Sequence, residues 1–95
     1  MVPKTDKADA KSEWLVYILK CRDGSHYTGI TNDLARRLKA HNEGTASKYT
    51  RSKRPVKVVF RETLRTKSQA LRRELEIKKL SRDQKVLLIK ARPKK

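Results

Sequence analysis

The chain has 95 residues, of which 36% are hydrophobic, and its 26 Lys and Arg residues outnumber 10 Asp and Glu to give a formal net charge of +16. This length suits one small domain whose thin core cannot enclose a large cofactor. A single cysteine, Cys21, excludes an internal disulfide framework and a multi-cysteine zinc site. The charge favours a polyanionic partner, with nucleic acid as the first candidate and an anionic membrane surface as the second. No apolar run is long enough to span a membrane or to serve as a signal-peptide core, so a reducing cytoplasm is expected.

The first part of the chain predicts a basic arm and a β-hairpin. Residues 1–12 are polar, rich in Lys and aperiodic, and we interpret them as a disordered N-terminal arm. Trp14–Lys20 is a β-rich run dense enough to be a strand that is buried on both faces. A tight turn at Asp23-Gly24 then returns the chain into a second strand, His26–Ile30.

A helix is predicted next. Thr31 or Asn32 can serve as its N-cap, and the helix continues to His41-Asn42 before Gly44 ends it. Residues 44–54 are rich in Lys and Arg and are interpreted as a loop.

The second half of the chain predicts one more strand and two helices. Val56–Arg61 has the densest β-branched content in the chain. Thr66 or Ser68 caps the next helix, and Ser81–Lys90 forms a last helix before a frayed basic tail at residues 91–95.

The predicted order of elements is β-β-α-β-α-α. Three strands with short links form a small antiparallel sheet, and the helices must cover its faces. The sequence therefore predicts a single α+β domain over residues 13–90.

One acidic residue, Glu74, lies on the apolar side of its predicted helix. With about 100° per residue and Ala70 at zero, Ile77 falls near ~340°, Glu74 near ~40°, Leu71 near ~100° and Leu75 near ~140°. An unpaired carboxylate is rarely buried, because an isolated charge loses its hydration. An inward carboxylate therefore indicates either a metal ion, as in an enzyme, or an Arg or Lys across the fold, as in a structural salt bridge.

Further polar residues gather near the predicted hairpin. Arg37 and His41 are four residues apart, so they lie on one side of their helix, where both flank the buried stripe while Arg36 faces solvent. Tyr17 and Tyr27 lie on opposite arms of the hairpin and can be brought to one end of the sheet beside this helix.

Five separated elements occur in a specific order: Val16-Tyr17-Ile18, Tyr27-Thr28-Gly29, Arg37, His41 and Ala70-Leu71-x-x-Glu74. This order and spacing resemble the GIY-YIG nuclease family, and most of all its small single-domain bacterial branch, the YhbQ-like proteins. The match spans residues 14 to 80. The first motif reads Val-Tyr-Ile in place of Gly-Ile-Tyr, and the second reads Tyr-Thr-Gly in place of Tyr-Ile-Gly. Many family members also place an Asn near the active site after the metal-binding Glu, and this chain has no Asn after Asn42.

The resemblance implies a divalent-metal endonuclease that uses Mg²⁺ or Mn²⁺. By this resemblance Glu74 binds the metal, and Arg37 contacts the scissile phosphate. Tyr17 is a candidate base for the attacking water, and Tyr27 helps to position the reactants. His41 matches a position often filled by a catalytic or phosphate-binding histidine.

The chemistry is also reasonable without the family. Phosphodiester hydrolysis needs a metal at a non-bridging oxygen, a fixed cation for the developing charge and a group that deprotonates water. The pKa of a tyrosine is ordinarily near ~10, so Tyr17 as the base requires a nearby metal or a nearby cation, such as Arg37 or Lys48, to lower its pKa. His41 is the alternative base because histidine titrates near neutrality.

Contacts to nucleic acid are predicted at five further positions: Gly29, Arg36, Lys48, Arg51 and Lys78. Gly29 fits a place where the backbone passes close to another group or a ligand. The sequence shows no zinc finger, separate recognition helix or aromatic stacking platform, so contacts to the backbone or to a distorted structure are expected, without strong sequence specificity.

The predicted function is a metal-dependent DNA endonuclease of repair or recombination, with DNA preferred over RNA. We expect a monomer in the cytoplasm that is associated with the nucleoid and relies on a protein partner for targeting. The alternative is a basic nucleic-acid-binding module that kept the scaffold and lost efficient catalysis. A structural interpretation of two of these residues is that Arg37 pairs with Glu74 as a salt bridge between helices.

Overall fold

The structure is a computed structural model that describes residues 13–91. The predicted N-terminal arm and residues 92–95 lie outside the described residues. Ala91, which the sequence analysis placed in the tail, is the last residue of the final helix.

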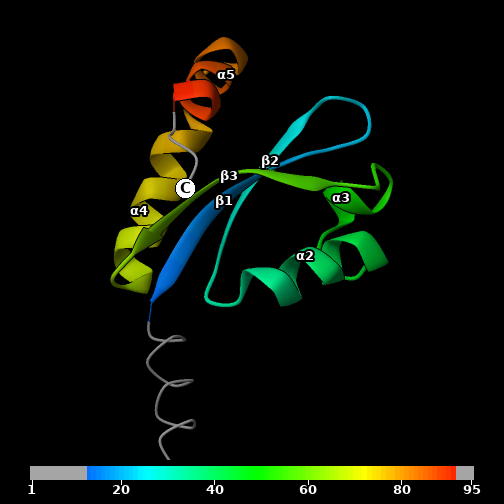
Figure 1. Ribbon diagram of the computed structural model, residues 1–95, viewed down its shortest axis with the longest axis horizontal. Coiled ribbons are helices and arrows are strands. Elements are labelled where there is room, and N and C mark those ends of the chain that lie inside the picture. The colour runs from blue at the N-terminus through cyan, green and yellow to red at the C-terminus, as the bar shows by residue number, and fades with distance from the viewer. Residues whose placement is uncertain (1–12, 92–95) are drawn as a thin grey trace, which may run out of the picture.

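Three antiparallel strands form one sheet (Figure 1). They are β1 (Trp14–Lys20), β2 (His26–Thr31) and β3 (Lys57–Leu64), in the order β2-β1-β3, so β1 is the central strand. Four consecutive residues of β1, Val16 to Leu19, are buried, as expected for a strand covered on both faces. The predicted α+β fold with a three-stranded antiparallel sheet is therefore confirmed.

The turn between β1 and β2 is held by side-chain bonds. Gly24 has φ +87°, a left-handed conformation that glycine adopts without steric cost. The Asp23 carboxylate accepts hydrogen bonds from the Ser25 amide at 3.0 Å and from its hydroxyl at 2.6 Å. The Lys53 ammonium lies 3.1 Å from the same carboxylate, and the Arg22 amide donates to the Lys53 carbonyl at 3.0 Å. These bonds attach the turn to the segment that precedes β3.

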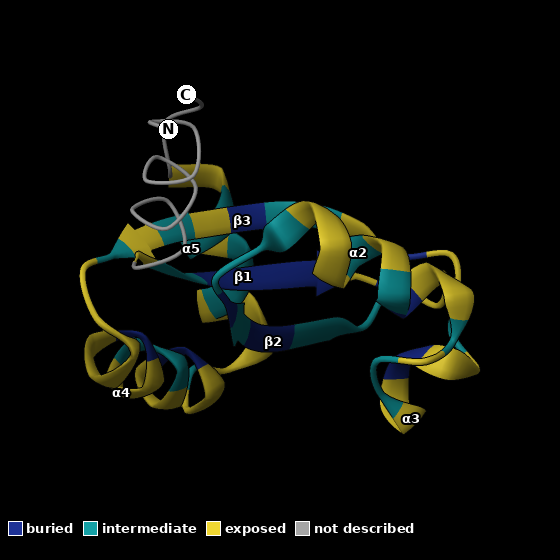
Figure 2. Ribbon diagram, turned by 90° about the horizontal axis from the view of Figure 1, so that it is seen from below, coloured by how far each residue is buried: buried dark blue, intermediate teal, exposed yellow. Residues whose placement is uncertain are grey.

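The helices cover both faces of the sheet (Figure 1). On one face lies α2 (Leu34–Glu43), and on the other lie α4 (Lys67–Lys78) and α5 (Arg82–Ala91). Alternate residues of β1 point to opposite faces, so they enter two separate clusters. The cluster beneath α4 contains Val16, Ile18, Phe60 and Ile77, and the cluster beneath α2 contains Tyr17, Leu19, Cys21 and Val56. Figure 2 shows this burial along β1 and the exposed outer faces of the helices. Within residues 13–91, no helix is long and apolar enough to cross a membrane.

The N-cap of α2 differs from the prediction. Asp33 is the cap, and its side chain accepts a hydrogen bond from the Arg36 amide at 3.3 Å. Thr31 and Asn32 were predicted wrongly, because β2 continues through Thr31, which pairs with Leu15. The end of the helix at Gly44, which has φ +86°, is as predicted.

The predicted loop at residues 44–54 contains a single-turn helix, α3 (Lys48–Arg51). Ser47 caps it by accepting a hydrogen bond from the Tyr49 amide at 3.1 Å. The observed order is therefore β-β-α-α-β-α-α. After the cis Arg54–Pro55 bond, β3 runs to Leu64, three residues beyond the predicted end.

The last two helices begin at residues that the sequence analysis proposed. Thr66 caps α4 by accepting a hydrogen bond from the Gln69 amide at 3.1 Å. At the start of α5, the Ser81 hydroxyl accepts from the Gln84 amide at 3.2 Å, and the Gln84 side chain accepts from the Ser81 amide at 2.9 Å. This reciprocal pair is a capping box.

Candidate active site

A buried tyrosine and a buried histidine from different elements share a hydrogen bond. Tyr17 of β1 is 1% exposed and His41, near the end of α2, is 0% exposed. The Tyr17 Oη atom lies 3.0 Å from His41 Nε2. β1 presents Tyr17 on the face that α2 covers, and the last turn of α2 places His41 above that face.

Gly29 allows Tyr17 to lie across β2. The two residues are directly opposite in the β1–β2 register. A Cβ atom at position 29 would lie 2.6 Å from Tyr17 Oη, and 3.2 Å from a ring carbon of Tyr27. The ring of Tyr27 also contacts His41, with ring centroids 5.1 Å apart. Gly29 is buried, so the close approach that it permits is to Tyr17, a different role from the predicted nucleic-acid contact.

The second ring nitrogen of His41 is bonded to a residue that the sequence analysis missed. His41 Nδ1 lies 2.9 Å from Thr50 Oγ1, and Thr50 of α3 is 0% exposed. The Thr50 hydroxyl also donates to the Ser47 carbonyl at 3.3 Å. A single-turn helix is too short to show hydrophobic periodicity, so no sequence signal could have identified Thr50.

The environment keeps both Tyr17 and His41 neutral near pH 7. Burial raises the pKa of Tyr17 to about 12, although the nearby Arg37 side chain lowers it. Desolvation therefore outweighs the effect of the cation, and Arg37 does not bring the pKa of Tyr17 below its ordinary value. Burial lowers the pKa of His41, and the charge of Arg37 lowers it further.

Arg37 and Glu74 belong to different helices, and both influence the pKa of the Tyr17 hydroxyl. Arg37 is an exposed residue of α2. The Glu74 side chain, on α4, is 16% exposed, and its Oε2 atom lies 3.2 Å from Lys78 Nζ, one turn later on α4. The ion pairs within residues 13–91 do not include Arg37 with Glu74, so the predicted structural bridge between the two helices is absent there.

The buried stripe of α4 is narrower than predicted. Ala70 and Ile77 are 0% exposed, whereas Leu71 is 44% exposed and Leu75 is 59% exposed. The helix meets the sheet along the line of Ala70 and Ile77, and Glu74 borders that line. Its carboxylate is consequently shielded from most solvent but remains reachable.

The carboxylate of Glu74 suits a hard divalent ion that keeps water ligands better than a metal ion whose ligands all come from protein side chains. Within the described part of the chain, no three His, Cys, Asp or Glu side chains cluster to form a complete metal site. Mg²⁺ is usually held by one or two carboxylates, with water and substrate phosphate oxygens as its other ligands. One carboxylate with an ammonium as its present partner is compatible with that pattern.

The other predicted nucleic-acid contacts are on the surface. Arg36 lies on α2, Lys48 and Arg51 lie on α3, and all three are exposed. The Lys78 side chain is 52% exposed.

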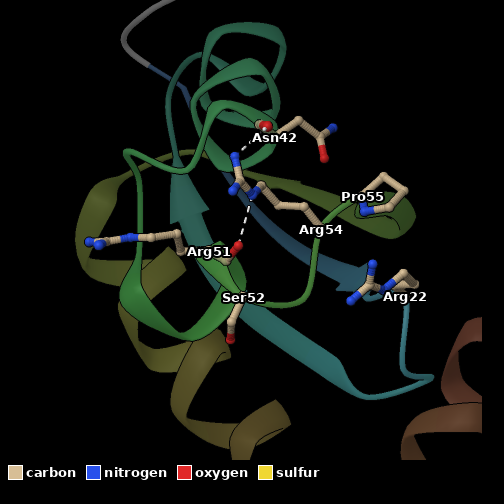
Figure 3. A pocket seen from close by; sticks show the side chains of 6 residues that line it. All are labelled: Arg22, Asn42, Arg51, Ser52, Arg54 and Pro55. Carbon is tan, nitrogen blue, oxygen red and sulfur yellow. Dashed lines mark hydrogen bonds between the residues drawn. The ribbon is translucent and has the colours of Figure 1, made fainter.

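An arginine-lined hollow lies beside α2 and α3 (Figure 3). Its volume is about 470 Å³, and it is lined by Arg22, Asn42, Arg51, Ser52, Arg54 and Pro55. Arg54 donates to the Arg51 carbonyl at 2.7 Å and to the Asn42 carbonyl at 3.4 Å, which fixes its guanidinium (Figure 3). In the described structure, none of the three arginines is paired with a carboxylate. The sequence analysis had singled out Arg51 alone of these three.

Comparison with known proteins identifies the family. The family model described as the GIY-YIG catalytic domain matches residues 13–86, which include Tyr17, Tyr27, Arg37, His41 and Glu74. The chain belongs to the GIY-YIG family. Relatives of the GIY-YIG chain include a UPF0213 protein from Desulfotalea psychrophila, which is 48% identical over 97% of this chain and 81% of the relative. A UPF0213 protein from Clostridium perfringens is 54% identical over 81% of this chain and 83% of the relative.

A solved structure agrees with the GIY-YIG assignment. The solution NMR structure of a UPF0213 protein from Bacillus halodurans has 44% sequence identity and a TM-score of 0.56, over 84% of this chain and 85% of that chain. These relatives confirm the predicted small single-domain branch of the GIY-YIG family.

Proposed function

We propose that this GIY-YIG protein is a metal-dependent endonuclease that hydrolyses phosphodiester bonds of DNA in repair or recombination. The observation that supports this proposal best is the 3.0 Å hydrogen bond between Tyr17 and His41, at a hydroxyl whose pKa is also influenced by Arg37 and Glu74. Phosphodiester hydrolysis needs a base, a cation and a metal-binding carboxylate, and these four side chains supply one set of them.

In this proposal, Tyr17 and His41 act together as the general base. Because Tyr17 has a pKa of about 12, it keeps its proton at neutral pH and cannot act as a free phenolate. It can accept a proton from water only while it passes its own proton to His41 Nε2. The lowered pKa of His41 keeps this nitrogen available as an acceptor.

Arg37 and Glu74 would act on the phosphate. Arg37 is exposed next to the hydroxyl, so its guanidinium can bind a non-bridging oxygen and stabilise the developing negative charge. Glu74 would hold Mg²⁺ or Mn²⁺, which when bound neutralises phosphate charge and acidifies water.

Cations around this site would hold the DNA backbone. Arg36, Lys48, Arg51 and Lys78 are exposed, and the hollow adds Arg22 and Arg54. Such contacts fix the position of the strand without reading its bases, so weak sequence preference follows. We further propose that the protein acts as a monomer at the nucleoid in the cytoplasm, with a protein partner to direct it.

One observation favours a second candidate, a nucleic-acid-binding module with little catalysis. Lys78 already pairs with the Glu74 carboxylate at 3.2 Å and competes with a metal ion for Oε2. If this pair persists on DNA, the scaffold would bind phosphates and cleave slowly.

The two candidates are separated by nicking of supercoiled plasmid DNA with and without Mg²⁺ or Mn²⁺. The wild-type protein should nick only with metal, whereas Glu74→Gln and Tyr17→Phe should not nick but should bind DNA as before. Tyr17→Phe is a matched variant because it keeps the ring over Gly29 and removes only the hydroxyl. Equal, metal-independent nicking by wild type and Glu74→Gln contradicts the endonuclease proposal, and binding with no nicking supports the module.

The same assay on single-stranded, duplex and branched substrates, with RNA as a competitor, identifies the preferred substrate. We expect DNA to be cut in preference to RNA.

A further inference from the structure

A line of buried hydrogen bonds continues beyond the Tyr17–His41 pair into α3. Thr50 Oγ1 lies 2.9 Å from His41 Nδ1, and the Ser47 carbonyl lies 3.3 Å from Thr50 Oγ1. Thr50 and His41 are both 0% exposed. Water therefore does not compete for these bonds, and their directions are set by the protein groups alone.

The donors and acceptors along this line determine which ring nitrogen of His41 carries the proton. Thr50 has one hydroxyl hydrogen, and a carbonyl can only accept, so the hydrogen that is donated to Ser47 leaves a lone pair facing His41 Nδ1. With the Thr50 hydrogen on the Ser47 carbonyl, Nδ1 carries the ring hydrogen and donates it to Thr50. Nε2 consequently presents its lone pair to Tyr17.

The other end of the line requires the same tautomer. The Arg37 guanidinium near Tyr17 Oη has only donors, so the hydroxyl oxygen accepts from Arg37 and its hydrogen must find an acceptor elsewhere. His41 Nε2 lies 3.0 Å from Tyr17 Oη and can accept this hydrogen. In the opposite tautomer, Nε2–H and Arg37 would both point donors at Tyr17 Oη, and the Tyr17 hydrogen would lose that partner.

We propose that Thr50 is a positioning residue that selects the Nδ1–H tautomer of His41 and thereby keeps Nε2 ready to accept the Tyr17 proton. This inference rests on the proposed nuclease function for its consequence, but not for the tautomer itself. Thr50 touches neither DNA nor the reacting atoms; it acts through His41.

The proton balance shows why the tautomer matters. As the water oxygen bonds to phosphorus, a water proton passes to Tyr17 Oη, and the Tyr17 proton passes to His41 Nε2. The P–O bond to the departing strand end breaks, and that oxygen takes a proton from solvent. The His41 imidazolium keeps its Nδ1–H bonded to Thr50 and later returns the other proton through Tyr17 to solvent.

The test compares Thr50→Val, which keeps the side-chain shape without the hydroxyl, with Thr50→Ser, which keeps the hydroxyl. Long-range ¹H–¹⁵N correlation spectra of the histidine rings report which nitrogen carries the proton. The chain has two histidines, so a His26→Gln background leaves only His41. We expect the Nδ1–H tautomer in the wild type and Thr50→Ser, and a shift to Nε2–H in Thr50→Val.

Nicking kinetics supply the second measurement. Thr50→Val should slow nicking by about 10- to 100-fold, by analogy with the loss found when the hydrogen-bond partner that orients a metal-bound histidine is removed. Its DNA affinity should not change, and Thr50→Ser should stay close to wild type.

A wild-type spectrum that shows Nε2–H overturns the inference even if the protein cleaves DNA, and this measurement needs no folded variant. Thr50→Val that retains Nδ1–H and full activity also overturns it. If no preparation cleaves DNA, the proposed function fails, whereas the spectra still test the tautomer.

Discussion

Tyr17 lies across Gly29 so closely that a Cβ atom at position 29 would be 2.6 Å from Tyr17 Oη. The φ of Gly29 is not in the left-handed region, so the need for glycine at this position is steric. Tyr17 is 1% exposed and packs in one buried cluster with Leu19, Cys21 and Val56, so it has little room to retreat.

Gly29→Ala should therefore displace Tyr17 from His41. We expect a loss of about 1–3 kcal/mol in the free energy of unfolding, as for other overpacked cores, and a larger loss of nicking than this destabilisation explains. Gly24→Ala is the control, because its cost comes from the φ of +87° and its nearest non-neighbouring heavy atom is 3.8 Å away. Urea denaturation and plasmid nicking are measured on both. A fully active Gly29→Ala would contradict the geometry.

The lowered pKa of His41 predicts that the protein is less stable in mild acid. The folded state disfavours protonated His41, because of burial and then the charge of Arg37. The unfolded chain protonates its histidine below about pH 6.5, so it binds more protons than the folded state there. This contribution is fully present above that pH and is lost as the pH falls through the folded pKa.

The pKa of His26 is also lowered, mainly by burial, so His41 must be isolated in a His26→Gln background. Urea midpoints at about pH 7.5 and about pH 5 should fall with acidification in His26→Gln. The double variant His26→Gln/His41→Gln should lose most of this dependence. An equal pH dependence in both proteins would exclude His41 as its source.

Lys78 should modulate metal binding at Glu74. Lys78→Gln frees the Oε2 atom that the ammonium now holds at 3.2 Å, so half-maximal nicking should need about twofold less Mg²⁺. Lys79→Gln removes the same charge at an exposed position that has no ion pair in the described structure. A metal requirement that rises in Lys78→Gln alone would show that Lys78 orients the carboxylate instead.

The arginine-lined hollow should contribute to DNA affinity. Arg22→Gln and Arg51→Gln should each weaken binding and reduce the slope of log K against log salt by about one, as expected for one lost phosphate contact. Arg65→Gln is the control, because it makes the same charge change beyond the other end of β3. Equal effects at all three positions would indicate that net charge, and not the hollow, determines affinity.

The sequence predicted the sheet well because its signals there are local. The β-rich run of β1 and the Asp23-Gly24 turn specify a hairpin within a few residues of one another. Helix caps were less predictable. Thr31 has a suitable side chain for an N-cap, but its backbone pairs with Leu15 in the sheet, and Asp33 caps the helix instead.

The site was only partly predictable because a helical projection does not say where the sheet lies. It placed Glu74 beside Ala70, as observed, but it also placed the exposed Leu71 and Leu75 on the apolar side. The role of Thr50 depends on the contact between the single-turn helix α3 and His41. The two residues are nine positions apart, and no hydrophobic periodicity indicates this contact. The pKa of Tyr17 likewise depends on how far its side chain is buried, and the composition of the strand does not predict this burial.

Successive side chains of β1 point to opposite faces of the sheet, so a shift of one residue along this strand would change the packing on both faces. Val16 and Ile18 face α4, while Tyr17 and Leu19 face α2. Inserting or deleting one residue in this strand would exchange the two sets, placing the Tyr17 hydroxyl within the apolar cluster beneath α4 and an isoleucine against the imidazole of His41. Length variation among natural variants of this chain should therefore avoid the central strand and gather in the connections between elements.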